Sequence, residues 1–234
     1  PYNLEFTLEH YAFESEGAGW DNFYNSIVMA GSVAVFGAIV VFTGAFLIDK
    51  PRRDHGIRQV FQFVALLPMA IPGLVLGLAY LFFINDPDNP LEILYGTIVI
   101  LVVNCLAHFY TVAHLTSLTA LKQMDKEFES VSASLKVPLF RSYMRITVPV
   151  CMPTILDVSM YLFLSSMTTV SAVIFLYGPT TKVASVAAIH LAESGDSAVA
   201  AAMAMLIVYA CIVVRIAHAF ASGWLLKRMQ AWRQ

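Results

Sequence analysis

Five long apolar stretches constrain what this chain can fold into more than any other feature of its sequence. They run over residues 23–48, 59–84, 91–118, 150–177 and 198–226. A helix needs about 20 mostly apolar residues to cross the hydrocarbon core of a bilayer. The chain has 59% hydrophobic and 13% charged residues, too few charges for the surface of a soluble domain. We therefore predict an all-α, polytopic helical membrane protein with five transmembrane helices.

The charged residues predict the orientation of these helices. Lysine and arginine gather in the links 49–58 and 120–149 and in the tail after residue 226. Acidic side chains gather before residue 22 and in the turn 85–92, and Lys182 is the only Lys or Arg among the connections on that side. By the positive-inside rule the basic links face the cytoplasm. Five spans then place Pro1 outside and Gln234 in the cytoplasm.

The outer connection 178–197 holds an apolar stretch that is too short to cross a bilayer. We expect a re-entrant or surface helix there. His190 and Glu193 in the same connection are open to two interpretations, a surface metal site or a solvated loop, and the second is favoured.

The cytoplasmic link before the fourth span has the pattern of two short helices. Apolar residues recur at helical spacing at Met124, Phe128, Val131 and Leu135. Pro138 suits the first turn of a second helix. That helix carries an i,i+4 pair of arginines, Arg141 and Arg145, and we expect Pro149 to close it. Two such helices would form a rigid knob that fits a cleft on a soluble partner, and the alternative is a solvated loop with surface helices.

This link resembles the EAA loop of type I permeases of binding-protein-dependent ATP-binding-cassette (ABC) importers. Counted back from Pro149, the glutamate of that motif falls on Ser130, beside Glu129, and its glycine falls on Lys136. The motif agrees with this sequence at Leu135, at Asp125 and in the closing Arg-Ile-Thr-Val-Pro. Because the glycine is lost, the sequence does not decide whether the usual tight turn between the two helices forms. The resemblance implies that the following residues couple the chain to an ATPase: Glu129, Ser130, Val131, Ser132, Leu135, Lys136, Arg141, Arg145 and Pro149.

Other segments resemble the ferric-iron and phosphonate branch of these permeases. The Pro-Met-Ala-Ile-Pro-Gly run that ends at Gly73 resembles this branch, and the Asn25-Ser26 pair is similar to that of many type I permeases. Residues 167–177 and 200–206 resemble 2-aminoethylphosphonate permeases, with a ferric-iron permease as the alternative. Because members of this branch often fuse two halves, the chain is similar to the C-terminal half of a longer protein. The implied domains are an outer segment 1–22, a permease domain 23–226 and a cytoplasmic tail 227–234.

The resemblance implies a non-catalytic permease of the bacterial inner membrane that moves a small solute by alternating access. Its implied partners are ABC ATPase subunits, an extracytoplasmic solute-binding protein, a second permease half and the lipid bilayer, with no nucleic acid. No cofactor is expected. ATP hydrolysis must come from a partner, because the chain lacks a Gly-x-x-x-x-Gly-Lys-Ser/Thr loop. A secondary transporter is the alternative from a different class, but no internal repeat supports it.

Polar residues inside the apolar stretches are expensive in lipid and are candidates for function. Ser165, Thr168 and Thr169 fall within one arc at helical spacing, which fits either a polar transit path or hydroxyls bonded to their own helix. Asp157 lies at a depth comparable to that of Arg215, so the two either pair or separately face water and the inner interface.

Neither cysteine nor histidine predicts a metal site. Cys105, Cys151 and Cys211 fall in or beside apolar stretches and are interpreted as small hydrophobic residues. Six residues separate His108 from His114, which places them about 120° apart around a helix.

Overall fold

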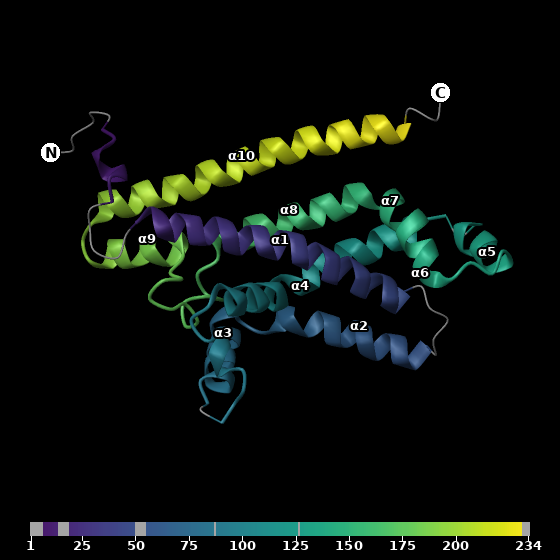
Figure 1. The fold of residues 1–234 in the computed structure, drawn as a ribbon, viewed down its shortest axis with the longest axis horizontal. Coiled ribbons are helices and arrows are strands. Elements are labelled where there is room, and N and C mark those ends of the chain that lie inside the picture. The colour runs from purple at the N-terminus through teal and green to yellow at the C-terminus, as the bar shows by residue number, and fades with distance from the viewer. Residues whose placement is uncertain (1–6, 14–18, 50–54, 87, 126, 231–234) are drawn as a thin grey trace. The chain divides into compact units, whose positions relative to one another are not determined.

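The computed structural model describes residues 7–13, 19–49, 55–86, 88–125 and 127–230 (Figure 1). These residues form helices joined by turns. In the described ranges β-type pairing is limited to one isolated bridge between Gly96 and Tyr177. The all-α prediction is confirmed.

Three helices are long and apolar enough to cross a membrane: α1 (Trp20–Asp49), α4 (Ile98–Gln123) and α10 (Ser197–Gln230). Two bent pairs add up to two further spans. The first pair is α2 (His55–Ala70) with α3 (Gly73–Ile84). The second joins the helical run 139–150 to α8 (Met152–Thr168). The five predicted spans agree with the upper count, in which each bent pair is one span.

The predicted span 59–84 is broken at Ile71 and Pro72, where α2 ends and α3 has not begun. Pro72 has extended backbone angles, φ −57° and ψ 139°, and caps the N-terminus of α3. Proline has no N–H to donate and disfavours helical angles in the residue before it. Pro72 therefore divides this apolar stretch, whereas Pro68 lies inside α2.

The predicted span 150–177 is wrong at its C-terminal end. Helix α8 stops at Thr168, and residues 169–176 form turns in which Val173 N donates to Val170 O at 3.0 Å. Thr169 therefore lies outside the helix that was expected to carry it in one arc with Ser165 and Thr168.

The second link helix ends at Val150, one residue after the expected closure at Pro149. The helical run continues from α6 (Leu139–Ser142) through a π-helical segment, η3 (Tyr143–Thr147), into α7 (Val148–Val150). Pro149 lies in the first turn of α7, where its missing N–H is tolerated. The chain bends by 75° only after α7, at the junction with α8.

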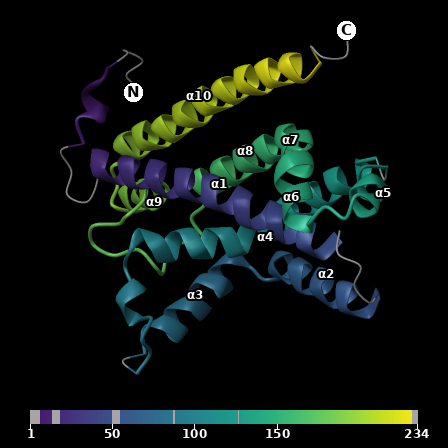
Figure 2. The same ribbon diagram turned by 45° about the vertical axis from the view of Figure 1, so that its right-hand side comes forward.

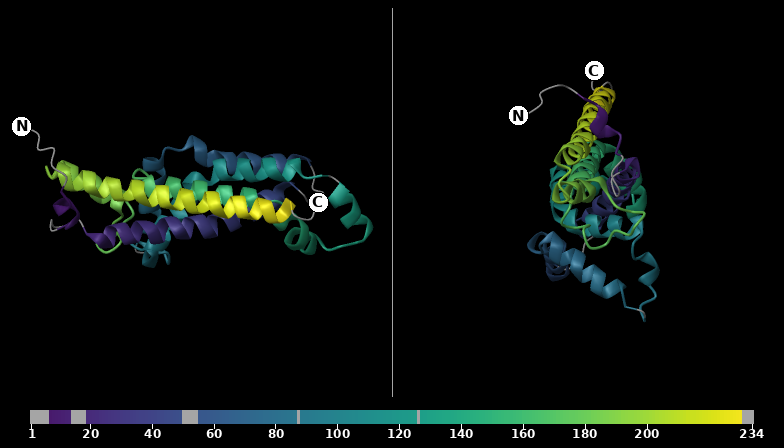
Figure 3. Two further views of the ribbon diagram at one scale, coloured as in Figure 1. Left: turned by 90° about the horizontal axis from the view of Figure 1, so that it is seen from above. Right: turned by 90° about the vertical axis from the view of Figure 1, so that its left-hand side faces the viewer.

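The chain divides into two compact units, each built from separate stretches of sequence. Unit 1 comprises residues 1–32, 72–105 and 164–214, and unit 2 comprises residues 33–71, 106–163 and 215–234. Unit 1 includes the predicted short outer helix, α9 (Ala184–Glu193), beside the first turns of α1 (Figure 2). Unit 2 includes α5 (Glu127–Ser134) and the run from α6 to α7 (Figure 3).

In unit 1 the connection after Tyr177 is held by side chains of α1. Asn25 Nδ2 donates to the carbonyl oxygens of Thr180 and Lys182 at 2.9 and 3.1 Å. Ser26 Oγ accepts from the N–H of Ala184 at 2.7 Å, at the start of α9. Both side chains are buried. The Asn-Ser pair of the sequence therefore satisfies the backbone of this connection where water is excluded.

Candidate functional site

The candidate site is the surface formed by α5, α6 and η3, which we call the coupling surface. Helix α5 follows Asp125, whose Oδ1 accepts the N–H of Glu127 at 2.9 Å. A carboxylate in this position satisfies one of the free N–H groups at the start of a helix. Ser132 Oγ and Ser142 Oγ lie 3.3 Å apart and join α5 to α6.

Helix α5 ends in a tight turn at Lys136. The N–H of Val137 donates to Ser132 O at 2.9 Å, and the N–H of Lys136 donates to Ala133 O at 3.1 Å. This is the Schellman pattern, which needs a left-handed residue at the position that Lys136 occupies. Lys136 adopts it with φ 51°. The tight turn, whose presence the sequence did not decide, is therefore formed. Its lysine adopts the conformation that glycine adopts at no steric cost.

The far end of the coupling surface is anchored by Tyr143, the first residue of η3. Its hydroxyl lies 2.8 Å from Thr43 Oγ1 on α1. Its ring stacks on Phe46 and Phe42, with ring centroids 4.6 and 6.1 Å away. These residues belong to a buried cluster that also includes Leu121 and Cys151. Tyr143 falls in the predicted second helix, but no local pattern marks it as an anchor, because its partner Thr43 lies 100 residues away in the sequence.

The outer side of the coupling surface presents large apolar side chains. Leu135 and Phe140 are each 70% exposed, and Val131 is 56% exposed. Arg141 and Arg145 are exposed on the same run. Apolar side chains ringed by charge are typical of a protein interaction site. Of the other predicted coupling residues, Ser130 and Pro149 are exposed, Ser132 is half-buried, and the side chain of Glu129 lies outside the described residues.

The polar residues of the predicted transit path differ in their surroundings. Thr168 Oγ1 donates to Leu164 O of its own helix at 3.0 Å. Ser165 is half-buried on the same helix, whereas Thr169 is buried and its carbonyl accepts a bond from Ser185 Oγ at 2.6 Å. The bond made by Thr168 corresponds to the second of the two predicted alternatives, a hydroxyl bonded to its own helix.

The predicted pairing of Asp157 with Arg215 is replaced by a different contact. A carboxylate oxygen of Asp157 on α8 lies 3.2 Å from Nε2 of His218 on α10. His218 follows Arg215 by three residues, which is nearly one helical turn. In the part of the chain that the structure describes, no group of three or more His, Cys, Asp or Glu residues is arranged to hold a metal ion.

Residues 41–227 match the family model described as "Binding-protein-dependent transport system inner membrane component". The chain belongs to this family. The family is a transport component rather than an enzyme, and the match includes the whole coupling surface.

Two curated relatives of this transport component have different names. The "Ferric transport system permease protein FbpB" of Actinobacillus pleuropneumoniae is 29% identical over 94% of this chain and 31% of its own length. The "Putative 2-aminoethylphosphonate transport system permease protein PhnV" of Salmonella choleraesuis is 25% identical over 94% of this chain and 81% of its own length. The chain thus spans about a third of the ferric relative.

A solved structure shares the fold of this transport component. It is a bacterial ABC transporter involved in the import of the acidic polysaccharide alginate, with a TM-score of 0.74 and 18% identity. The match covers 96% of this chain and 85% of that one. At this identity the likeness bears on the fold alone.

Proposed function

We propose that this chain is a pore-forming half of an ATP-driven importer and that a partner ATPase subunit docks on the coupling surface. The observation that carries the proposal is the contrast between the two sides of that surface. Its inner side is fixed by the buried Tyr143, while its outer side exposes Leu135, Phe140 and Val131 to water. An apolar face of this kind gains free energy when a partner's cleft covers it.

The contacts of Tyr143 supply a route from the docking surface to α1. A partner that moves α6 and η3 also moves the Tyr143 ring, which is packed against Phe42 and Phe46 and bonded to Thr43. A close-packed contact transmits displacement because it has little room to compress. ATP-driven closure of the partner therefore reorients α1, as alternating access requires.

The charge pattern supports the orientation that we propose, and membership of the family supports the partners. We place residues 1–22 outside, residues 23–226 as the permease domain and residues 227–234 in the cytoplasm of a bacterium. The chain works with a second permease half and an extracytoplasmic solute-binding protein. We propose that the second half is fused to this one, and the 31% coverage of the ferric relative supports this arrangement.

The cargo that we propose is 2-aminoethylphosphonate or a similar organophosphonate, and ferric iron is the second candidate. The similarity to PhnV supports the first and the similarity to FbpB supports the second. The proposed path is rich in hydroxyls and poor in carboxylates, with Ser165, Thr168 and Thr169 on it. A hard ferric ion held in transit would favour anionic oxygen ligands, whereas a small zwitterion can pass a weakly polar path.

The test uses the full-length transporter assembled with its ATPase and solute-binding protein. Leu135→Asp places a charge in the docking face, so we expect the protein to insert normally and to lose binding-protein-stimulated ATP hydrolysis. The matched control is Ile93→Asp, because Ile93 is 82% exposed but lies in the connection placed outside. Glu129→Lys should act like Leu135→Asp. Cysteines at Ser132 or Ser134 should cross-link to the ATPase. Normal stimulation of ATP hydrolysis in both the Leu135→Asp and the Glu129→Lys variant would exclude this surface as the contact.

A further inference from the structure

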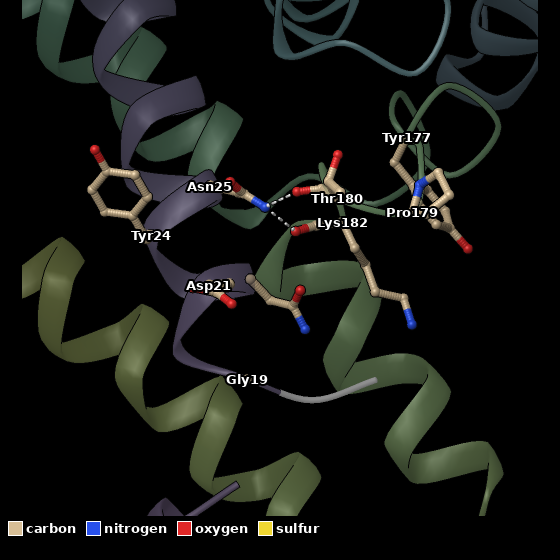
Figure 4. A pocket seen from close by; sticks show the side chains of 9 residues that line it. Gly19, Asp21, Tyr24, Asn25, Tyr177, Pro179, Thr180 and Lys182 are labelled. Atoms are coloured by element: carbon tan, nitrogen blue, oxygen red, sulfur yellow. Dashed lines mark hydrogen bonds between the residues drawn. The ribbon is translucent and has the colours of Figure 1, made fainter. Parts of the chain in front are cut away.

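A cavity of ≈ 640 Å³ lies in unit 1, between the first turns of α1 and the connection that precedes α9. It is lined by Asp21 and Asn25 of α1 and by Tyr177, Thr180 and Lys182 of the connection, among others. Figure 4 shows Asn25 directed from α1 toward the connection, and the Lys182 side chain extending from that connection. The cavity is in the size range of small-molecule sites, roughly 300–1,000 Å³.

The wall of this cavity next to Lys182 is held by hydrogen bonds. Asn25 Nδ2 binds the carbonyl oxygens of Thr180 and Lys182. The same connection is held from its other side, since Gly178 N–H donates to Thr181 Oγ1 and Thr181 Oγ1 donates to Gly96 O, both at 2.7 Å. The backbone that carries Lys182 is therefore fixed before any ligand arrives, which lowers the cost of binding.

The cavity holds two opposite charges that do not neutralise each other. Lys182 is the only Lys or Arg in the connections that the charge pattern places outside, and Asp21 lies on the opposite wall. No ion pair within the described residues joins Lys182 to Asp21 or to another carboxylate. A ligand that carries both charges can satisfy the two side chains at once, and each charge-assisted hydrogen bond is stronger than a neutral one.

We propose that this cavity is an entry site for a small zwitterionic solute, in which Lys182 binds an oxyanion group and Asp21 binds an amine. The inference rests on the proposed import function and adds a recognition site in the permease itself. A cationic cargo is disfavoured, because Lys182 would repel it at close range. The site needs to bind only weakly, since a transported solute must also leave.

The test measures ligand binding to the purified full-length transporter, assembled with its ATPase in nanodiscs and without solute-binding protein. The probe is 2-aminoethylphosphonate, and ethylphosphonate and ethanolamine each retain one of its two charges. We expect the zwitterion to bind more tightly than either comparator by calorimetry. Lys182→Gln should weaken binding of the zwitterion and of ethylphosphonate about tenfold, the effect of losing one hydrogen bond to a charged group.

Asp21→Asn should instead weaken binding of the zwitterion and of ethanolamine, and leave ethylphosphonate unchanged. The matched control is Asp86→Asn, because Asp86 is an exposed acidic residue of another outer turn that does not line the cavity. Exchanging the two charges in Lys182→Asp with Asp21→Lys should recover part of the binding. Each single variant should elute as a monodisperse complex.

Stimulation of ATP hydrolysis by the binding protein is measured on the same preparations and separates the two proposals. Stimulated hydrolysis without zwitterion binding to the wild type would overturn the entry site and leave the import function standing. Unchanged affinity in Lys182→Gln would overturn it as well. Absence of stimulated hydrolysis in the wild-type assembly would overturn the import function itself.

Discussion

Nε2 of His218 lies 3.2 Å from a carboxylate oxygen of Asp157, and this contact joins α10 to α8 within unit 2. The Asp157 side chain is 59% exposed and that of His218 is 11% exposed. Solvent access to the carboxylate limits what the contact contributes. Exposed ion pairs are worth at most about 1 kcal/mol.

We predict that His218→Gln lowers the thermal stability of the purified protein only slightly, by less than about 1 kcal/mol in free energy of unfolding. Arg215→Gln is the control on the neighbouring turn, and the coupling energy between Arg215 and Asp157 should be close to zero. A double-mutant cycle with Asp157→Asn measures each pair. A larger coupling energy for Arg215 than for His218 would contradict the observed contact.

Lys136 is a position where a smaller residue should improve stability. Lys136→Gly relieves a left-handed conformation, so we expect the free energy of unfolding to rise by about 1 kcal/mol. The same change at Lys122, in the last turn of α4, should instead lower the free energy of unfolding by less than about 1 kcal/mol, because it replaces a good helix former and removes a cation from a helix C-terminus. Denaturation of the purified protein checks both. Equal destabilisation by the two variants would mean that the turn is not formed.

The hydroxyl and the ring of Tyr143 should have separable effects. Tyr143→Phe removes the bond to Thr43 and should cost about 1 kcal/mol, with coupling to ATP hydrolysis largely kept. Tyr143→Ala also empties the space between Phe42 and Phe46 and should cost about 3–5 kcal/mol. We expect it to uncouple transport from hydrolysis. Thr43→Val should lower stability by the same amount as Tyr143→Phe, and the double variant should be no less stable than either single variant, because both changes remove the same hydrogen bond.

Gly178 is packed directly against the backbone of Gly96. A Cβ on Gly178 would lie 2.7 Å from Gly96 O, so we expect Gly178→Ala to displace the connection and to lower the melting temperature. Gly223 in α10 has no atom within 4 Å of its Cβ position, and Gly223→Ala should raise the melting temperature instead. If Gly→Ala lowers the melting temperature at position 178 and raises it at position 223, steric crowding explains the first change and helix propensity explains the second.

The orientation can be tested with single cysteines in intact cells. A cysteine at Asp88 should react with an impermeant maleimide, and one at Ser132 should react only after permeabilisation. The charge segregation of the connections is the reason. Labelling of the Ser132 variant in intact cells would reverse the orientation.

The break in the second span has a local marker in the sequence, which the prediction of one continuous span did not use. Pro72 removes a donor and restricts Ile71, and both effects are properties of neighbouring residues. The end of α8 at Thr168 has no such marker, since the apolar run continues past it. The helix ends there because Thr169 and the residues after it bond to other parts of unit 1, including Ser185 Oγ.

The outline of the coupling surface was predicted from the sequence, because its first helix has a local pattern. The helical spacing from Phe128 to Leu135 is a local pattern, and it indicated α5. The left-handed conformation of Lys136 could not be predicted from the sequence. A lysine tolerates this conformation only when the hydrogen bonds of the turn outweigh its strain. The anchor at Tyr143 depends on Thr43, 100 residues earlier.

By itself the sequence determined the class of the protein and its apolar helices, and it predicts which links face each side of the bilayer. A bilayer leaves no water for backbone groups, so an apolar run that faces lipid must satisfy its backbone hydrogen bonds within its own helix. The tertiary structure alone decided that Asp157 faces His218, that Tyr143 bonds Thr43, and that Lys182 and Asp21 line one cavity. Those contacts depend on the rotation of each helix and the path of each connection, which are set by packing between segments distant in the chain.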